Sequence, residues 1–111
     1  MTPFPVTIEP AQTKVSATGG KWTQHISNRG DKKIVFKVRC TNNNEYRVSP
    51  VFGFVDAAGN ATIEVNRLNG APKEDKIVIQ YAVAPVGVSD AQTAFAHLQP
   101  TENLTVNIVA S

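Results

Sequence analysis

The sequence predicts an all-β sandwich with one short helix, formed by a single domain over residues 1–111. Turn-forming residues interrupt the chain about every 8–12 residues, which is typical of short antiparallel strands. Between these turns, apolar and polar side chains alternate with a period of two, and helical spacing occurs near the C-terminus. A chain of 111 residues is long enough to bury one two-layer core.

The clearest strand is the segment KIVFKVRCT, residues 33–41. One of its two alternating rows is apolar and is expected to face the core: Ile34, Phe36, Val38 and Cys40. The other row carries the charges and is expected to face outward: Lys33, Val35, Lys37 and Arg39. This pattern indicates a half-buried strand with a basic outer face.

Further strand-like segments lie between the other turns: Val6–Glu9, Lys14–Ala17, Trp22–Asn28, Tyr46–Ser49, Phe52–Val55, Ala61–Leu68, Lys76–Ala84 and Glu102–Val109. We expect about seven strands in all. The alternation predicts these inward-facing side chains: Ile63, Val65, Ile77, Ile79, Tyr81, Val83, Leu104, Val106 and Ile108. It also places Trp22, Gln24 and Ile26 together on one face of their strand. The segment Asn69–Asp75 is predicted to be a polar loop.

One segment has helical spacing. Ser89 and Gln92 form an S-x-x-Q pattern that is typical of a helix N-terminus. The apolar residues that follow share one helical face: Ala91, Ala94, Phe95 and Leu98. Pro100 is expected to end the helix.

Composition excludes several classes of protein. The net charge of +2 is too small to indicate nucleic-acid binding, which usually needs a concentrated basic stripe. The one cysteine excludes an intrachain disulfide, so nothing points to an oxidising compartment. The N-terminus does not resemble a signal peptide, and no apolar run approaches the roughly 20 residues that span a bilayer. We therefore expect a cytoplasmic protein with no membrane-inserted segment.

The residue types that carry catalysis or bind metals are scattered. His25 and His97 lie far apart, in different predicted elements, and Cys40 is expected to be a buried, unreactive thiol. Acidic residues such as Glu74 and Asp75 are expected to be solvated. No spacing typical of zinc ligands or of a phosphate-binding loop occurs. The sequence therefore predicts a protein that is not an enzyme and needs no cofactor or metal.

A candidate binding surface lies on the outward rows of two strands. Val35, Lys37 and Arg39 project from one strand, and Lys76, Val78 and Gln80 project from the other. If the strands are neighbours, these side chains form one basic and apolar surface suited to a peptide that carries acidic residues beside an apolar anchor. The alternative is that the charges are an ordinary solvated face, and the pattern leaves both interpretations open.

The central third of the chain, FKVRCTNNNEYRVSPVFGFVDAAGNATIEV, resembles the major sperm protein (MSP) domain family. That family has a strand of the type F-K-V-K-T-T, then R-x-Y-x-V-x-P, then a glycine step before the next strand. Further on, DKIVIQYAVAP resembles the family's K-F-x-V-Q-x-x-x-A-P strand, and DAQTAFAHL lies where the family has its short helix. Each motif is weak alone, but their order along the chain is fairly specific.

The resemblance implies a seven-stranded immunoglobulin-like sandwich without a catalytic site. It also implies two kinds of partner. Nematode major sperm proteins form dimers and assemble into the filaments that move amoeboid sperm. The related VAMP-associated proteins bind acidic peptides that contain two phenylalanines (the FFAT motif). The chain looks most like small nematode sperm-specific members of the family, which implies a place in the sperm cytoskeleton.

The resemblance to the VAMP-associated proteins implies a peptide-binding face at Arg39, Cys40, Thr41, Lys76 and Val78. Lys37, from the outward row of the same strand, completes our set of site candidates. The match has departures, because Arg39 replaces a lysine, Cys40 a threonine and Val78 a methionine. Asn103 lies near a position where the relatives tend to have another lysine. We therefore expect a protein that acts through self-association or contacts with filament components, with acidic-peptide binding as the alternative.

Overall fold

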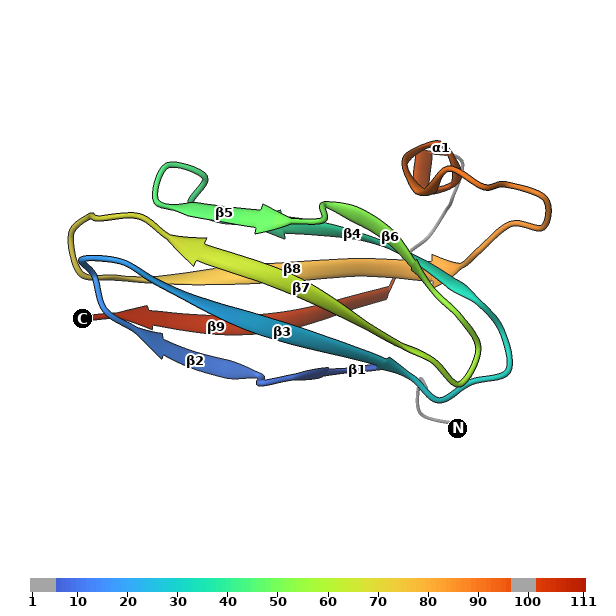
Figure 1. The fold of residues 1–111 in the computed structure, drawn as a ribbon, viewed down its shortest axis with the longest axis horizontal. Coiled ribbons are helices and arrows are strands. Elements are labelled where there is room, and N and C mark those ends of the chain that lie inside the picture. The colour runs from blue at the N-terminus through green and yellow to red at the C-terminus, as the bar shows by residue number, and fades with distance from the viewer. Residues whose placement is uncertain (1–5, 97–101) are drawn as a thin grey trace.

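The computed structural model describes residues 6–96 and 102–111, which form two packed β-sheets and one short helix (Figure 1). In chain order the elements are β1 (Val6–Glu9), β2 (Gln12–Val15), β3 (Gly20–Asn28), β4 (Ile34–Cys40), β5 (Tyr46–Ser49), β6 (Phe52–Val55), β7 (Asn60–Arg67), β8 (Lys73–Val83), α1 (Ala91–Ala96) and β9 (Glu102–Ala110). No helix among these residues is long and apolar enough to cross a membrane. The predicted all-β sandwich with one short helix is confirmed.

The strands are divided between a four-stranded sheet, in the order β1-β3-β7-β5, and a five-stranded sheet, in the order β2-β9-β8-β4-β6. The strand pairs are antiparallel except for β2 and β9, which run parallel. Two chain segments take part in both sheets, because β1 continues into β2 and β5 continues into β6. The nine strands of the described ranges are therefore seven runs of extended chain, as the sequence predicted.

A proline lies at each point where a run changes sheets. Pro10 separates β1 from β2 and Pro50 separates β5 from β6, and both peptide bonds that precede them are cis. Proline has no N–H to donate, so within a sheet it is confined to strand ends, edges and breaks. At each change of sheet, the proline therefore interrupts the ladder of backbone hydrogen bonds. The extended run is divided into two short edge strands, one in each sheet.

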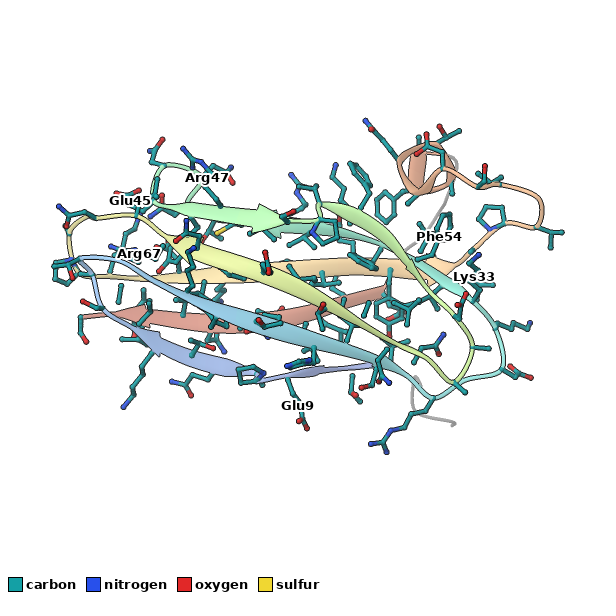
Figure 2. All side chains as sticks on the ribbon, in the orientation of Figure 1. Glu9, Lys33, Glu45, Arg47, Phe54 and Arg67 are labelled. Atoms are coloured by element: carbon teal, nitrogen blue, oxygen red, sulfur yellow. The ribbon has the colours of Figure 1, made fainter. Side chains whose placement is uncertain are left out.

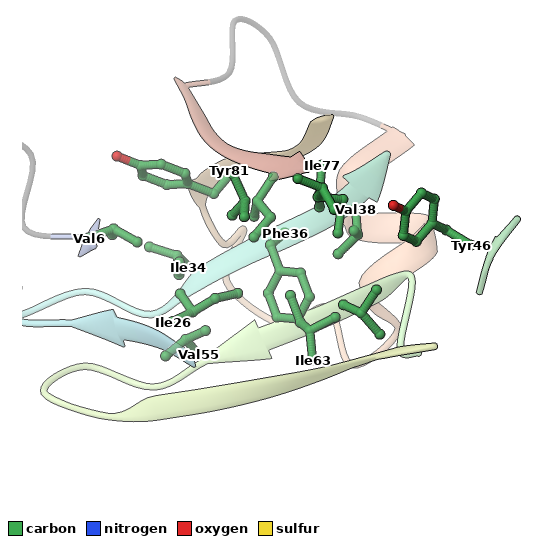
Figure 3. Packing of buried hydrophobic residues seen from close by; sticks show 14 residues of the cluster. Val6, Ile26, Ile34, Phe36, Val38, Tyr46, Val55, Ile63, Ile77 and Tyr81 are labelled. Carbon is green, nitrogen blue, oxygen red and sulfur yellow. The ribbon is translucent and has the colours of Figure 1, made fainter. Parts of the chain in front are cut away.

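The inner faces of the two sheets form the hydrophobic core (Figure 3). Its fully buried members include most of the predicted inward rows: Ile26, Ile34, Phe36, Val38, Ile63, Val65, Ile77, Ile79, Val106 and Ile108. Burying each such side chain stabilises the fold by about 1.5–3 kcal/mol. Gly53 has a packing role, since a Cβ there would lie 2.6 Å from the ring of Phe36. The prediction for Val83 was wrong, because this residue ends β8 and is 53% exposed.

Val35 departs from the predicted exposure of its row. It lies on the outer face of β4, as the alternation requires, but its exposed fraction is 0%. The cause is α1, which packs against β4 and β6 over this part of the sheet. The outward row of β4 is therefore divided into a covered end at Val35 and an open end at Arg39.

The helix begins one residue later than the capping pattern predicted. Asp90, not Ser89, caps it: the Gln92 amide donates to Oδ1 at 3.3 Å and the Thr93 hydroxyl donates to Oδ2 at 2.6 Å. The bond from Thr93 is the main reason that the pKa of Asp90 is lowered. Ala94 is buried, whereas the predicted residues His97, Leu98 and Pro100 lie outside the described residues.

The largest boundary error concerns β8. The sequence predicted a loop through Asp75, but β8 begins at Lys73, and Lys73, Glu74 and Asp75 pair with Ala110, Val109 and Ile108 of β9. Strand β2 begins two residues before the predicted start, and β3 begins at Gly20 instead of Trp22. The observed strands are longer than the predicted ones at these ends because backbone hydrogen bonds between strands continue through polar residues. The alternation of apolar and polar side chains, on which the prediction rests, stops earlier.

Candidate protein-interaction surface

Strands β4 and β8 are direct neighbours, so the two rows that the sequence singled out lie side by side. Arg39 is opposite Val78 and Lys37 is opposite Gln80. Beyond the end of β4, the amide of Thr41 donates to the carbonyl of Lys76 at 3.0 Å. We call the following five residues the basic face: Lys37, Arg39, Thr41, Lys76 and Val78. The structure thus brings five of the six candidates together.

Cys40 does not belong to the basic face. It alternates with Arg39, is half-buried and packs against the core. Burial raises the pKa of its thiol above the ordinary value, with a smaller contribution from the nearby Asp75 carboxylate. A thiol with a raised pKa is a poor nucleophile. The expectation of an unreactive, inward-facing thiol therefore agrees with its surroundings, and Cys40 is removed from the binding candidates.

The basic face carries positive charge, and its acidic neighbour in the outward row of β8 is Glu74, two residues before Lys76. Across β4, β8 and β9, Lys37 is opposite Gln80, which is opposite Asn103. Arg39 is opposite Val78, which is opposite Thr105, and Lys76 is opposite Asn107 of β9. None of these positions is acidic, and neither of the two ion pairs within the described residues includes a cation of the face. Arg39, Thr41 and Lys76 are exposed, and Lys37 and Val78 are half-buried. The cations are therefore accessible to an acidic partner.

The helix limits the face at one end. Phe95 of α1 packs edge-on against Phe52 of β6, with ring centroids 6.2 Å apart. The Lys37 ammonium lies over the Phe52 ring, 5.4 Å from its centroid, which is cation–π geometry. A similar pair joins Lys33 to Phe54 beside the helix, at 4.7 Å (Figure 2). At the opposite end the surface descends into a shallow hollow lined by Thr41, Lys76, Asn107 and Gln12, among others.

Thr41 is held by the carboxylate of Asp75, whose exposure was predicted wrongly. Asp75 was expected to be solvated, yet its exposed fraction is 6%. Its Oδ1 accepts the Thr41 hydroxyl at 3.1 Å and its Oδ2 accepts the Asn42 amide at 3.2 Å. The Lys73 ammonium lies 3.8 Å away. The signal was present in the sequence, since Asp75 stands two residues before Ile77 and so shares its inward row.

The remaining polar candidates lie away from this surface. His25 is exposed on the outer face of the four-stranded sheet, opposite Thr62 and Glu9. Buried Arg67 lies at the end of the sandwich near the C-terminus, close to Glu45 and Arg47 (Figure 2). Over residues 6–96 and 102–111, no group of three or more histidine, cysteine or acidic side chains is arranged to hold a metal ion.

The fold and its surface define a β-sandwich with one basic sheet face, and comparison with known proteins identifies the family. Residues 5–108 match the MSP (Major sperm protein) domain. The chain is 47% identical over 106 residues to Sperm-specific class P protein 9/11 of Caenorhabditis elegans, an alignment that covers 96% of this chain and 97% of that protein. Sperm-specific class P protein 10 of the same organism is 46% identical, with the same coverage. The chain therefore belongs to the major sperm protein domain family.

Solved structures agree with this assignment. SSP-19, an MSP-domain protein like family member in Caenorhabditis elegans, superposes with a TM-score of 0.92 at 45% identity, covering 95% of this chain and 98% of that one. WR4, a C. elegans MSP family member, gives a TM-score of 0.90 at 41% identity, with coverage of 96% and 98%. The PapD-like domain 7 of human CEP192 has a TM-score of 0.63 at 11% identity and covers 100% of this chain and 89% of that one, which shows the immunoglobulin-like fold alone.

Proposed function

We propose that this chain is a non-enzymatic, structural sperm protein that acts through contacts with other proteins. The observation that carries the proposal is the alignment with sperm-specific class P proteins over nearly the whole of both chains, at 47% identity for the protein named 9/11. The basic face supports a role in binding, because its cations take part in neither ion pair of the described residues and so remain available for contacts with other molecules.

The sheet edges restrict the kind of contact that this protein makes. Within residues 6–96 and 102–111, each of the four edge strands, β1, β2, β5 and β6, is four residues long. Short edges interrupted by proline are a common protection against strand-to-strand pairing between molecules. We therefore place the protein contacts of this chain on sheet faces and loops rather than on extended edges.

Sedimentation tests the structural role. Sedimentation velocity at increasing protein concentration would reveal self-association, and pelleting beside polymerising major sperm protein would reveal binding to the filament system. The expected result is concentration-dependent sedimentation or co-pelleting. A chain that stays monomeric at all concentrations and never co-pellets would contradict this function.

A second candidate function is the binding of an acidic peptide by the basic face. It is favoured by the side-by-side positions of Arg39 and Val78, which offer a cation next to an apolar side chain. Lys76 and Lys37 extend the positive charge along both strands. Charge-assisted hydrogen bonds to carboxylates are roughly twice as strong as neutral ones, so a peptide with acidic residues around an apolar anchor fits this surface.

Charge reversal tests the second function. A fluorescent acidic peptide with two phenylalanines is titrated against wild type, Arg39→Glu and Lys76→Glu. The matched control is Lys21→Glu, which reverses an exposed lysine on the outer face of the other sheet. We expect wild-type binding with a Kd below about 1 mM, corresponding to about −4 kcal/mol, and at least a roughly tenfold loss in the two face variants alone. Equal losses in all three variants would place the peptide elsewhere.

A further inference from the structure

The buried Asp75 carboxylate lies directly inside the end of the basic face. Asp75 belongs to the inward row of β8, between Glu74 and Lys76 of the outward row. From there its Oδ1 reaches the Thr41 hydroxyl at 3.1 Å. The same hydroxyl accepts the backbone N–H of Lys76 at 2.9 Å. Thr41 thus links the surface to a buried negative charge.

The donor and acceptor capacity of the hydroxyl determines what Thr41 can offer to a ligand. A threonine hydroxyl has one proton to donate and two lone pairs to accept with. Its proton is directed to Asp75, since a carboxylate oxygen at 3.1 Å is a closer and stronger acceptor than the Lys76 carbonyl at 3.4 Å. One lone pair accepts the Lys76 N–H. The group left for a ligand is therefore an acceptor, which pairs with a donor and not with a carboxylate.

The negative charge of Asp75 also disfavours a carboxylate at Thr41. An anion in hydrogen-bond contact with Thr41 would lie about 6 Å from the Asp75 carboxylate, and repulsion between like charges at that separation lowers the affinity by roughly threefold to hundredfold. Lys73 offsets part of this repulsion from 3.8 Å, but its side chain is 60% exposed and so well screened by solvent. An acidic group therefore binds more favourably toward Arg39 and Lys37 than at Thr41.

We propose that Asp75 is a specificity-determining positioning residue, which sets the register of an acidic partner on the basic face. It directs the partner's carboxylates toward Arg39 and Lys37 and selects a neutral hydrogen-bond donor, such as a backbone N–H or a hydroxyl, at Thr41. This inference rests on the acidic-peptide function proposed above. Asp75 does not touch the partner, because it acts through Thr41 and through its own charge.

The test compares a variant that loses the negative charge with a variant that keeps the charge but loses a hydrogen bond to the same carboxylate. Asn42 cannot turn its amide around, since its Oδ1 already accepts the N–H groups of Asn44 and Glu45. Asp75→Asn can still accept the Asn42 amide with its carbonyl oxygen and then turns its own amide toward Thr41, so it loses the negative charge and the acceptor for the Thr41 proton. Asn42→Ala loses the bond from Asn42 and keeps the charge. With the acidic diphenylalanine peptide at fixed ionic strength, we expect Asp75→Asn to bind about tenfold more tightly than wild type. Asn42→Ala should bind no more tightly than wild type.

The outcomes separate this inference from the function on which it rests. If Asp75 were merely structural, both variants would bind more weakly, and that result would overturn the inference. Binding by Asp75→Asn but not by wild type would contradict the peptide function while supporting the role of Asp75. If neither protein binds at 1 mM peptide, both proposals fail.

A measurement on wild type applies if Asp75→Asn does not fold. We expect the Thr41 hydroxyl proton to exchange slowly with water and to stay observable by NMR when the peptide is bound, because it remains directed to Asp75. A hydroxyl proton in fast exchange with water, with or without the peptide, would overturn the inference.

Discussion

The indole Nε1 of Trp22 donates a hydrogen bond of 2.6 Å to the Oε1 of Gln24, two residues further along β3. The Gln24 side chain is completely buried, and its Nε2 donates to the carbonyl of Pro10 at 2.8 Å. A glutamine inside the sandwich therefore holds the crossing from β1 to β2 in place. Gln24 lies on the same face of β3 as buried Ile26, as the alternation predicted, and these bonds explain why a polar residue is tolerated there.

Replacing Gln24 by leucine should reduce the free energy of unfolding by about 2–4 kcal/mol, because the substitution leaves the Trp22 indole and the Pro10 carbonyl without their partner. Urea unfolding followed by tryptophan fluorescence measures this loss. Thr23→Val is the matched control, since Thr23 is exposed on the same strand. A loss below about 0.5 kcal/mol for Gln24→Leu would contradict the anchoring role.

Val35 and Val78 provide a matched pair on the same sheet face. A threonine is nearly the same shape as a valine, but its hydroxyl is costly to bury without a partner. Val35→Thr should therefore lower the free energy of unfolding by about 1–3 kcal/mol. Val78→Thr should change it by less than about 0.5 kcal/mol, since Val78 is half-buried beside Arg39. Thermal and urea unfolding measure both changes. If Val35→Thr and Val78→Thr destabilised the protein equally, α1 would not be covering Val35.

The Tyr46 hydroxyl gives stability a dependence on alkaline pH. Burial raises the pKa of Tyr46, although the nearby Arg67 guanidinium opposes this shift. Because the unfolded chain ionises first, stability is complete below about pH 10, the unfolded pKa, and is lost as pH rises toward the folded pKa. Burial, and secondarily Glu102, also raises the pKa of Tyr81.

Tyr46→Phe should make the alkaline loss of stability less steep. Near neutral pH it should leave stability unchanged or raise it by up to about 1 kcal/mol, because within the described residues the hydroxyl has no hydrogen-bond partner. The measurement is the melting temperature from pH 8 to pH 11.5, with Tyr81→Phe as the parallel variant. An unchanged alkaline slope in both variants would rule out a contribution from these phenols.

Cys40 should react slowly in the folded protein. Its raised pKa keeps the thiol protonated at pH 8, and partial burial restricts access to the sulfur. Alkylation by iodoacetamide, followed by mass spectrometry, should be at least about tenfold slower in the native state than in urea. The native rate should keep rising above pH 9. Equal rates in the two states would show that Cys40 is freely accessible.

The sequence by itself determined which side chains form the core. The period of two in β4, β7, β8 and β9 assigns inward rows through local backbone geometry, which needs no knowledge of neighbouring strands. Ile77 and Ile79 were placed correctly on this basis, and Asp75 follows the same rule although its charge suggested solvent exposure. The strand count was also predictable, because the prolines mark the breaks.

Only the tertiary structure decided what the outward rows do. Val35 and Arg39 belong to one row and are indistinguishable by alternation, but α1, which begins more than fifty residues later, covers the first and leaves the second exposed. The basic face likewise depends on the pairing of β4 with β8, which are separated by three intervening strands. Local sequence sets the direction of a side chain, whereas its neighbours across the sheet come from long-range packing. For that reason the core could be derived residue by residue, and the interaction surface required the fold.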